Sequence, residues 1–224
     1  SLSFFSSVAL IILKLKYSLN SSKISYKLLN LNIIIFGLSI YIQDMTIFLK
    51  NKHTLKINDF YFQCCIGKKG LTKKKREGDK KTPIGTFCIS SLYFRKDRIG
   101  FPDTKLKCIQ IKKSMGWCDD IKSLRHYNSL INTKNNVKHE KLFRKDNFYD
   151  LMIPIKYNPK RVIGKGSCIF IHLTKNYKPT AGCIALKKKD FLIMLKIINK
   201  KTKIKIYYPL CPKILEPILK KVEE

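Results

Sequence analysis

One histidine and one cysteine are spaced so that they could do chemistry together. His172 follows an apolar run at residues 168–171, and Cys183 comes eleven residues later, after Gly182 and before a second apolar run at residues 184–186. A thiol acts as a nucleophile in its thiolate form, and a neighbouring imidazole can remove its proton. The pair therefore predicts Cys183 as a nucleophile and His172 as its general base and acid. The competing interpretation is a core histidine and a core cysteine, which are both common in apolar strands.

Two short buried strands are needed to hold this pair. Both apolar runs are bounded by Gly or Pro, and the polar loop between them lets the second run fold back on the first. Side chains alternate along a strand, so Phe170 and His172 should point to one face while Ile169 and Ile171 point to the other. Because Gly182 has no side chain, a substrate could approach the backbone there. The backbone N–H groups of Gly182 and its neighbours would then stabilise an oxyanion.

The stretch from residue 166 to residue 186 resembles the catalytic motif of the L,D-transpeptidase family, the YkuD-type domain, in which a strand-end histidine precedes a Gly-Cys nucleophile. Further similar motifs come upstream in the family's order: Glu77-Gly78-Asp79 and Thr82-Pro83-Ile84-Gly85 within residues 67–87, GWCDD at residues 116–120, Tyr127-Asn128, Tyr149-Asp150 and Tyr157-Asn158. The resemblance covers about residues 45–206. Several separate motifs in one order make a specific signal.

This resemblance implies a mainly β fold, with a sandwich-like mixed β-sheet core and a few short helices. It also implies that the Cys183 thiolate attacks a peptide carbonyl of a peptidoglycan stem peptide and forms a thioester acyl-enzyme. An amine of a second stem would resolve the thioester into a crosslink. If water resolved it instead, the enzyme would be an L,D-carboxypeptidase. No metal, no organic cofactor and no obligate protein partner are expected.

The chain departs from the family pattern around the nucleophile. Many members carry a second histidine before the Gly-Cys pair, where this chain has Thr180-Ala181, and an arginine two positions after the cysteine, where it has Ala185. The loop between His172 and Cys183 is also short for the family. These departures leave the donor bond and the substrate open.

Residues outside the catalytic pair are expected to bind the substrate, namely Trp117, Asp119, Asp120, Tyr127, Thr180 and Ala181. Trp117 is the chain's single tryptophan, and the two carboxylates beside it would suit an amine-bearing peptide. An equally weighted alternative is a structural aromatic plug followed by a helix N-cap. In that case Asp119 or Asp120 would precede a helix that runs to Leu130.

The chain of 224 residues is strongly basic, with 46 Lys+Arg against 15 Asp+Glu and a net charge of +31. Such a charge favours anionic partners, such as an anionic cell wall or a membrane surface. AT-rich codons are the favoured explanation for much of it, because isoleucine and asparagine are heavily used as well as lysine. No RNA-recognition or helix-turn-helix pattern accompanies the basic loop at residues 67–81, so no nucleic-acid partner is expected.

The spacing of the eight cysteines does not match that of a disulfide framework or a zinc motif. Most of them are scattered singly, and no C-x-x-C spacing occurs. Two rival classes of function remain. One is a metal site made by His172 and Cys183 with Cys118 or Cys168. The other is a basic protein that binds nucleic acid or cell wall without catalysis. The ordered motifs favour the enzyme over both.

Residues 1–44 differ from the rest, with Asp44 as their single acidic residue. The apolar run at residues 28–42 resembles a signal peptide or signal anchor but is short for a spanning helix. Upstream sequence translated in frame is an equally weighted alternative. We expect a catalytic domain at residues 45–208 and a tail at residues 209–224. An export signal would place the protein in the cell envelope or periplasm, with anchoring through residues 1–44 as one possibility.

The remaining pattern is mostly that of short strands with turn residues between them. Strands are expected at residues 46–49, 55–57, 60–66, 86–94, 106–111, 149–156 and 203–208. Apolar residues at helical spacing predict an amphipathic helix over residues 187–200.

Overall fold

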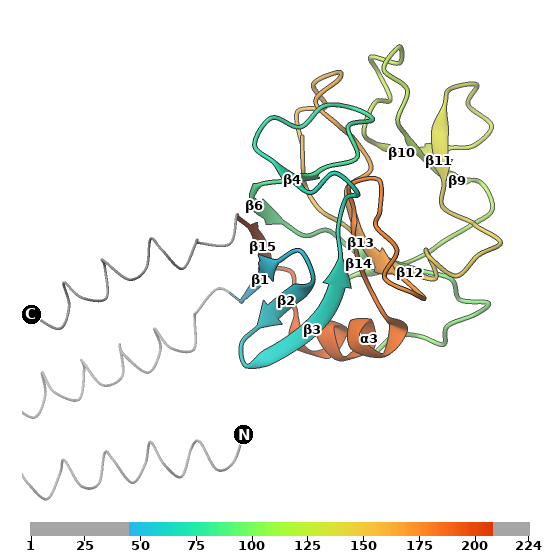
Figure 1. Ribbon diagram of the computed structural model, residues 1–224. Coiled ribbons are helices and arrows are strands. Elements are labelled where there is room, and N and C mark those ends of the chain that lie inside the picture. The colour runs from blue at the N-terminus through green and yellow to red at the C-terminus, as the bar shows by residue number, and fades with distance from the viewer. Residues whose placement is uncertain (1–44, 208–224) are drawn as a thin grey trace, which may run out of the picture. The chain divides into compact units, whose positions relative to one another are not determined.

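The computed structural model describes residues 45–207, and within them the fold is mainly β (Figure 1). A ten-stranded mixed sheet curls on itself, and a three-stranded sheet and a two-stranded ribbon are attached to it. The ten strands, in spatial order, are β6 (Gly85–Cys88), β15 (Lys203–Ile206), β1 (Thr46–Asn51), β2 (Thr54–Ile57), β3 (Phe60–Cys65), β14 (Ile184–Leu186), β13 (Phe170–Leu173), β12 (Leu151–Pro154), β7 (Leu92–Phe94) and β8 (Cys108–Gln110). The smaller sheet is formed by β10 (Leu130–Asn132), β9 (Met115–Cys118) and β11 (His139–Lys141), and the ribbon by β4 (Leu71–Thr72) and β5 (Thr82–Pro83).

Strands β7, β12 and β13 send alternate side chains into two different clusters. We call the first the aliphatic core; it includes Ile47, Leu55, Ile57, Leu151, Ile153, Ile169, Ile171, Ile184, Leu186 and Ile204. We call the second the aromatic cluster; it consists of Tyr93, Ile111, Leu142, Tyr149, Met152, Phe170 and Cys183, with partly buried Trp117, Phe143 and others against it. Period-two alternation explains this division, because neighbours on one strand face opposite sides.

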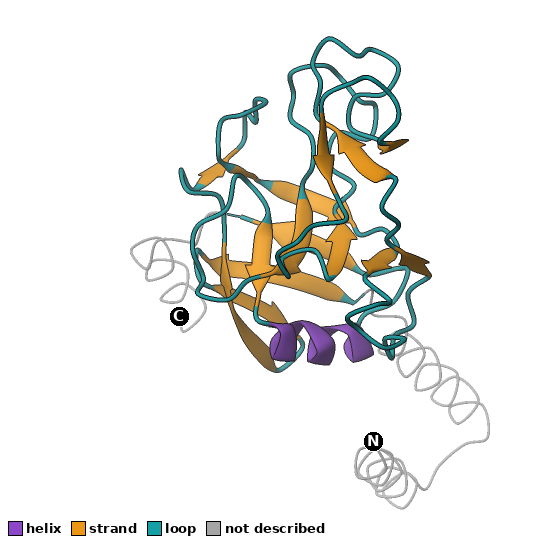
Figure 2. Ribbon diagram, turned by 90° about the vertical axis from the view of Figure 1, so that its right-hand side faces the viewer, coloured by secondary structure: helices purple, strands orange, loops and turns teal. Residues whose placement is uncertain are grey.

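A helix, α3 (Lys188–Ile197), follows β14 and packs on the aliphatic core through Phe191, Met194 and Leu195. Figure 2 shows it lying along one side of the curled sheet. This confirms the amphipathic helix predicted over residues 187–200. In the described part of the chain, no helix is long and apolar enough to cross a membrane.

Most predicted strands are confirmed, but two local predictions are wrong. The single strand predicted at residues 86–94 is divided: β6 pairs with β15, whereas β7 pairs with β12 and β8. The helix predicted from Asp119 or Asp120 to Leu130 is absent from this segment, which forms turns and then β10. Asp120 accepts a hydrogen bond from the Lys122 N–H (Oδ1, 3.0 Å), which closes a turn instead of capping a helix.

Residues 1–44 and the tail predicted at residues 209–224 lie outside the described part, so the predicted domain limits stay predictions.

Candidate active site

Strand register brings Cys183 and His172 to one face of the sheet. β13 and β14 run parallel, with Ile171 opposite Ile184 and His172 opposite Ala185. Cys183 therefore lies just before β14, beside Phe170, whose N–H donates to the Cys183 Sγ at 3.4 Å. Phe170 and Cys183 belong to the aromatic cluster, while Ile171 and Ile184 belong to the aliphatic core. The alternation predicted from the sequence is confirmed.

His172 is buried and held in one tautomer. Its Nδ1 lies 2.8 Å from the Leu173 carbonyl oxygen, so Nδ1 carries the hydrogen and Nε2 keeps the lone pair. The ring packs edge-on against Tyr149, with 5.3 Å between ring centroids. Burial lowers the pKa of His172 to about 4. The imidazole is therefore neutral near pH 7 and has the form of a base.

Cys183 is also buried, and burial raises the pKa of its thiol to about 12, even though the Phe170 N–H favours the thiolate. The Sγ–H donates to the Cys168 carbonyl oxygen at 3.1 Å. In this conformation the thiol proton is thus directed to the backbone of the segment before β13. This hydrogen bond must break before the proton can pass to another group. The resting pair is a neutral thiol and a neutral imidazole.

Gly182 shapes the turn that presents the thiol. Its φ of +145° lies in a region that suits glycine, and a Cβ there would come within 2.9 Å of the Lys81 carbonyl oxygen. Its carbonyl accepts from Thr82 Oγ1 at 2.8 Å, and its N–H donates to Thr180 Oγ1 at 3.1 Å. That N–H is engaged within the turn, so the oxyanion role predicted for it requires Thr180 to release it.

Comparison with known proteins identifies the family. The family described as YkuD, L,D-transpeptidase catalytic domain, matches residues 40–206. The chain belongs to this family. A search of curated proteins finds no significant match.

Solved structures that resemble the chain include three bacterial proteins. The helical cell shape determining protein Pgp2 from Campylobacter jejuni is 17% identical, with a TM-score of 0.40, over 73% of this chain and 46% of Pgp2. L,D-transpeptidase 1 from Mycobacterium tuberculosis is 13% identical, with a TM-score of 0.34, over 73% of this chain and 58% of that protein. Bd1075 from Bdellovibrio bacteriovorus is 14% identical, with a TM-score of 0.40, over 80% of this chain and 56% of Bd1075. The chain thus matches about half the length of these proteins.

Tyr127 has a supporting place in this L,D-transpeptidase domain. It was predicted to bind substrate, but it is fully buried. Its hydroxyl donates to Glu77 Oε2 at 2.5 Å and accepts from the Gly166 N–H at 3.0 Å, while Ser167 Oγ donates to the same carboxylate oxygen at 2.7 Å. The hydroxyl thus fixes the segment that leads into β13, and the predicted contact of Tyr127 with substrate stays a prediction.

Asn128 joins two more of the family motifs to that segment. Its Oδ1 accepts from Trp117 Nε1 at 3.1 Å and from the Cys168 N–H at 3.3 Å. Its Nδ2 donates to the carbonyl oxygens of Tyr157 and Asn158. Because Cys168 supplies the carbonyl that accepts the thiol hydrogen of Cys183, Asn128 helps to fix the backbone that holds this thiol. Sequence reasoning noted Asn128 and Glu77 within motifs but gave them no role.

Trp117 lies on the aromatic cluster. Its ring packs edge-on against Phe170 at 5.4 Å and against Tyr93 at 6.4 Å between centroids. The contacts favour the aromatic plug over an open pocket wall. Asp119 pairs with Lys138 Nζ at 3.3 Å, and Asp120 accepts from backbone N–H groups of its own and the neighbouring turn.

Thr180 and Ala181 lie in the turn just before Cys183. Thr180 Oγ1 donates to the Cys183 carbonyl oxygen at 2.6 Å, and Ala181 is exposed at the turn. Their predicted contact with substrate stays a prediction.

No sequence motif predicts the charged group near His172. Arg144 binds Glu140 at 2.6 Å and Asp146 at 2.7 Å, and its guanidinium carbon lies 5.0 Å from the centroid of the Tyr149 ring that covers His172. As for the metal-site alternative, residues 45–207 contain no cluster of three or more His, Cys, Asp or Glu that could hold a metal ion.

Proposed function

We propose that this protein is a cysteine-dependent L,D-transpeptidase that acts on peptidoglycan stem peptides through a thioester acyl-enzyme. Family membership supports the general class. What supports the finer proposal is that the strand register puts Cys183 and His172 on one face of the sheet, and that the Nε2 of a neutral His172 keeps its lone pair.

The reaction begins from a neutral pair. Burial raises the pKa of Cys183 to about 12 and lowers the pKa of His172 to about 4, so a resting thiolate–imidazolium pair is strongly disfavoured. We infer that His172 takes the proton as Cys183 attacks the stem carbonyl, after the thiol has turned away from the Cys168 oxygen. The S–C bond forms, and the carbonyl π electrons move to oxygen.

Collapse of this intermediate breaks the peptide C–N bond, and the leaving amine takes the proton from the His172 imidazolium. A thioester on Cys183 remains. An amine of a second stem peptide then attacks the thioester carbonyl, loses its proton to His172, and expels the Cys183 thiolate, which is reprotonated. The products are a crosslinked peptide and the original thiol. Water in place of the amine would give a shortened stem, the L,D-carboxypeptidase outcome.

Peptidoglycan lies outside the cytoplasmic membrane, so this function also places the protein in the cell envelope or periplasm. The net charge of +31 would favour contact with anionic wall polymers or membrane surfaces there.

The test is intact mass spectrometry of the full chain incubated with purified disaccharide-tetrapeptide muropeptide, with separation of the products. Cys183→Ala should abolish the acyl adduct and all products. The matched control is Cys65→Ala, because Cys65 is also buried and donates from Sγ to a carbonyl oxygen, that of Lys178, at 3.2 Å.

A crosslinked dimer would establish transpeptidation, and a shortened stem would establish carboxypeptidase activity. The proposal is overturned if Cys183→Ala keeps full turnover, or if wild type forms neither adduct nor product with any stem peptide and its Cys183 resists small thiol reagents.

A further inference from the structure

Lys75 is a cation in an unexpected place. It is 7% exposed, and among residues 45–207 it is the one lysine that is buried. Codon bias can account for lysines on the surface, but burying an ammonium costs several kcal/mol unless it is paired and hydrogen-bonded. A buried lysine therefore calls for a specific reason.

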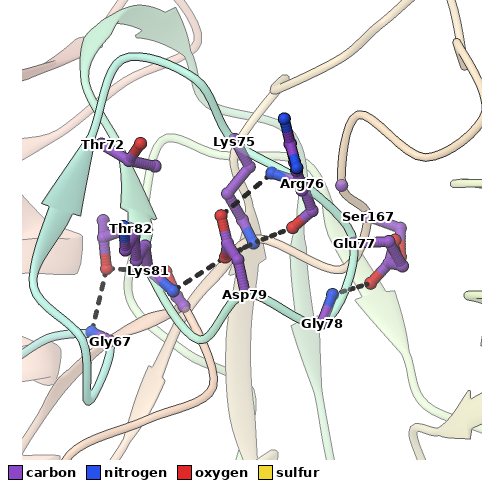
Figure 3. Close-up of polar contacts among 12 residues, drawn as sticks. Gly67, Thr72, Lys75, Arg76, Glu77, Gly78, Asp79, Lys81, Thr82 and Ser167 are labelled. Carbon is purple, nitrogen blue, oxygen red and sulfur yellow. Dashed lines mark hydrogen bonds and ion pairs between the residues drawn. The ribbon is translucent and has the colours of Figure 1, made fainter.

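The ammonium of Lys75 is held in place by its own loop (Figure 3). Nζ donates to Asp79 Oδ1 at 2.5 Å and to the Arg76 carbonyl oxygen at 3.0 Å. The Asp79 carboxylate also accepts the N–H groups of Arg76 and Lys81, both at 2.9 Å. The loop thus fixes both charges of the pair.

The stem of Lys75 lies against the two glycines that flank the catalytic strands. A Cβ on Gly166 would come within 2.8 Å of Lys75 Cγ, and one on Gly182 would lie 3.7 Å from Lys75 Cε. Gly166 begins the segment that leads into β13, and Gly182 directly precedes Cys183. The glycines leave room for Lys75, which carries its charge to the base of the turn that presents the nucleophile.

Two charges of opposite sign act on the thiol. Although burial dominates and raises the pKa of Cys183, Lys75 lowers it and Glu140, in β11, raises it. Glu140 is already bound to Arg144 at 2.6 Å. Lys75 is the cation that favours the thiolate from the side of the turn.

We propose that Lys75 is a positioning residue for the thiol chemistry: its ammonium stabilises the negative charge that develops on Cys183, and Asp79 holds the ammonium in place while weakening its effect. This deepens the proposed function and rests on it. Lys75 acts through Cys183 and the fold, with no contact to the reacting peptide required.

The test is the rate of alkylation of Cys183 by iodoacetamide in the folded full chain without any peptide, followed from pH 7 to pH 10 by site-resolved mass spectrometry. Lys75→Met removes the charge and keeps the stem, so the rate at each pH should fall on the order of tenfold and the profile should move to higher pH. Asp79→Asn removes the opposing charge and should move the profile to lower pH. Lys74→Met, at an exposed neighbour, should change it little.

Opposite shifts are the decisive result. If the Lys75–Asp79 pair were only a structural brace, both variants would break the same ion pair and would change accessibility in the same direction. Shifts of the same sign, or an unchanged profile in both, would overturn the proposal. If Lys75→Met failed to fold, Asp79→Asn would still test the proposal. An unchanged or slower alkylation of Cys183 in that variant would contradict it.

Failure of the proposed function would look different. If the two variants shift the alkylation profile in opposite directions but muropeptides are not turned over, the role of Lys75 is supported and the proposed substrate is wrong. If turnover depends on Cys183 but the profiles do not shift, the proposed function is supported and the role of Lys75 is wrong.

Discussion

The two faces of β13 use burial for different purposes. Ile169, just before the strand, and Ile171 enter the aliphatic core, where α3 packs. Phe170 and His172 face the other way, toward Tyr149 and Cys183. Both faces exclude water, but the first contains apolar atoms and the second contains a thiol, an imidazole and a phenol.

This difference bears on whether His172 is a core histidine or the proposed general base. A core histidine is satisfied when both ring nitrogens have partners, whereas the Nδ1–H of His172 donates to Leu173 and directs the Nε2 lone pair away from that contact. The thiol of Cys183 likewise donates to a backbone carbonyl, that of Cys168. Stability should therefore reside on the aliphatic face and reactivity on the aromatic face.

The largest effect is expected from His172→Gln. Loss of the general base should lower kcat/KM for muropeptides by about 10²- to 10⁴-fold, while the free energy of unfolding changes by about 1 kcal/mol or less, because glutamine can still hydrogen-bond the backbone. Product analysis and denaturant unfolding on the same preparation measure both. An active variant with a large loss of stability would reverse the assignment of the two faces.

Ile171→Ala, one residue away from His172, should lower stability and leave activity nearly unchanged. Removing a fully buried side chain from the aliphatic core should cost about 2–5 kcal/mol of unfolding free energy. Turnover per folded molecule should stay within about threefold of wild type, because the chemical face keeps its groups. A stable but inactive Ile171→Ala would mean that the two faces are not separable.

Stability should also fall on acidification because of His172. Its folded pKa of about 4 is below its ordinary value of 6.5, so the unfolded chain binds the proton more readily between these values. The free energy of unfolding should be undiminished above about pH 6.5 and should decline toward pH 4, by on the order of 3 kcal/mol at most.

Comparing unfolding of wild type and His172→Gln across this range isolates the histidine from the titrating carboxylates. If the two pH profiles are parallel, His172 is not buried in its neutral form.

Local pattern was enough to predict β13, β14 and α3. The alternation around Phe170 and His172 depends only on period two, and the helix only on apolar spacing. The turns after Asp120 could not be predicted in this way, because Asn128, with φ +52°, turns the chain back to Cys118 and on into β10.

The role of Tyr127 can be recognised only in the folded structure. Its partner Glu77 lies fifty residues away in sequence, so no local pattern reveals that the hydroxyl is already used. The family motifs marked both residues, but a motif records that a residue recurs and not what it touches. Lys75 belongs to the basic loop expected at residues 67–81, and only its burial distinguishes it from the neighbouring lysines.

The smallest predicted effect concerns Trp117, and it tests whether this side chain only packs in the aromatic cluster or also binds the peptide. Trp117→Phe keeps a ring against Phe170 but removes the Nε1–H that Asn128 accepts, so the free energy of unfolding should fall by about 1 kcal/mol. If Trp117 is a plug, KM for muropeptides should stay unchanged, because the ring does not meet the peptide. If it lines the peptide site, KM should rise with little change in stability. Steady-state kinetics and denaturant unfolding on the same variant separate the two possibilities. A raised KM would mean that the peptide-binding site extends from Cys183 to β9.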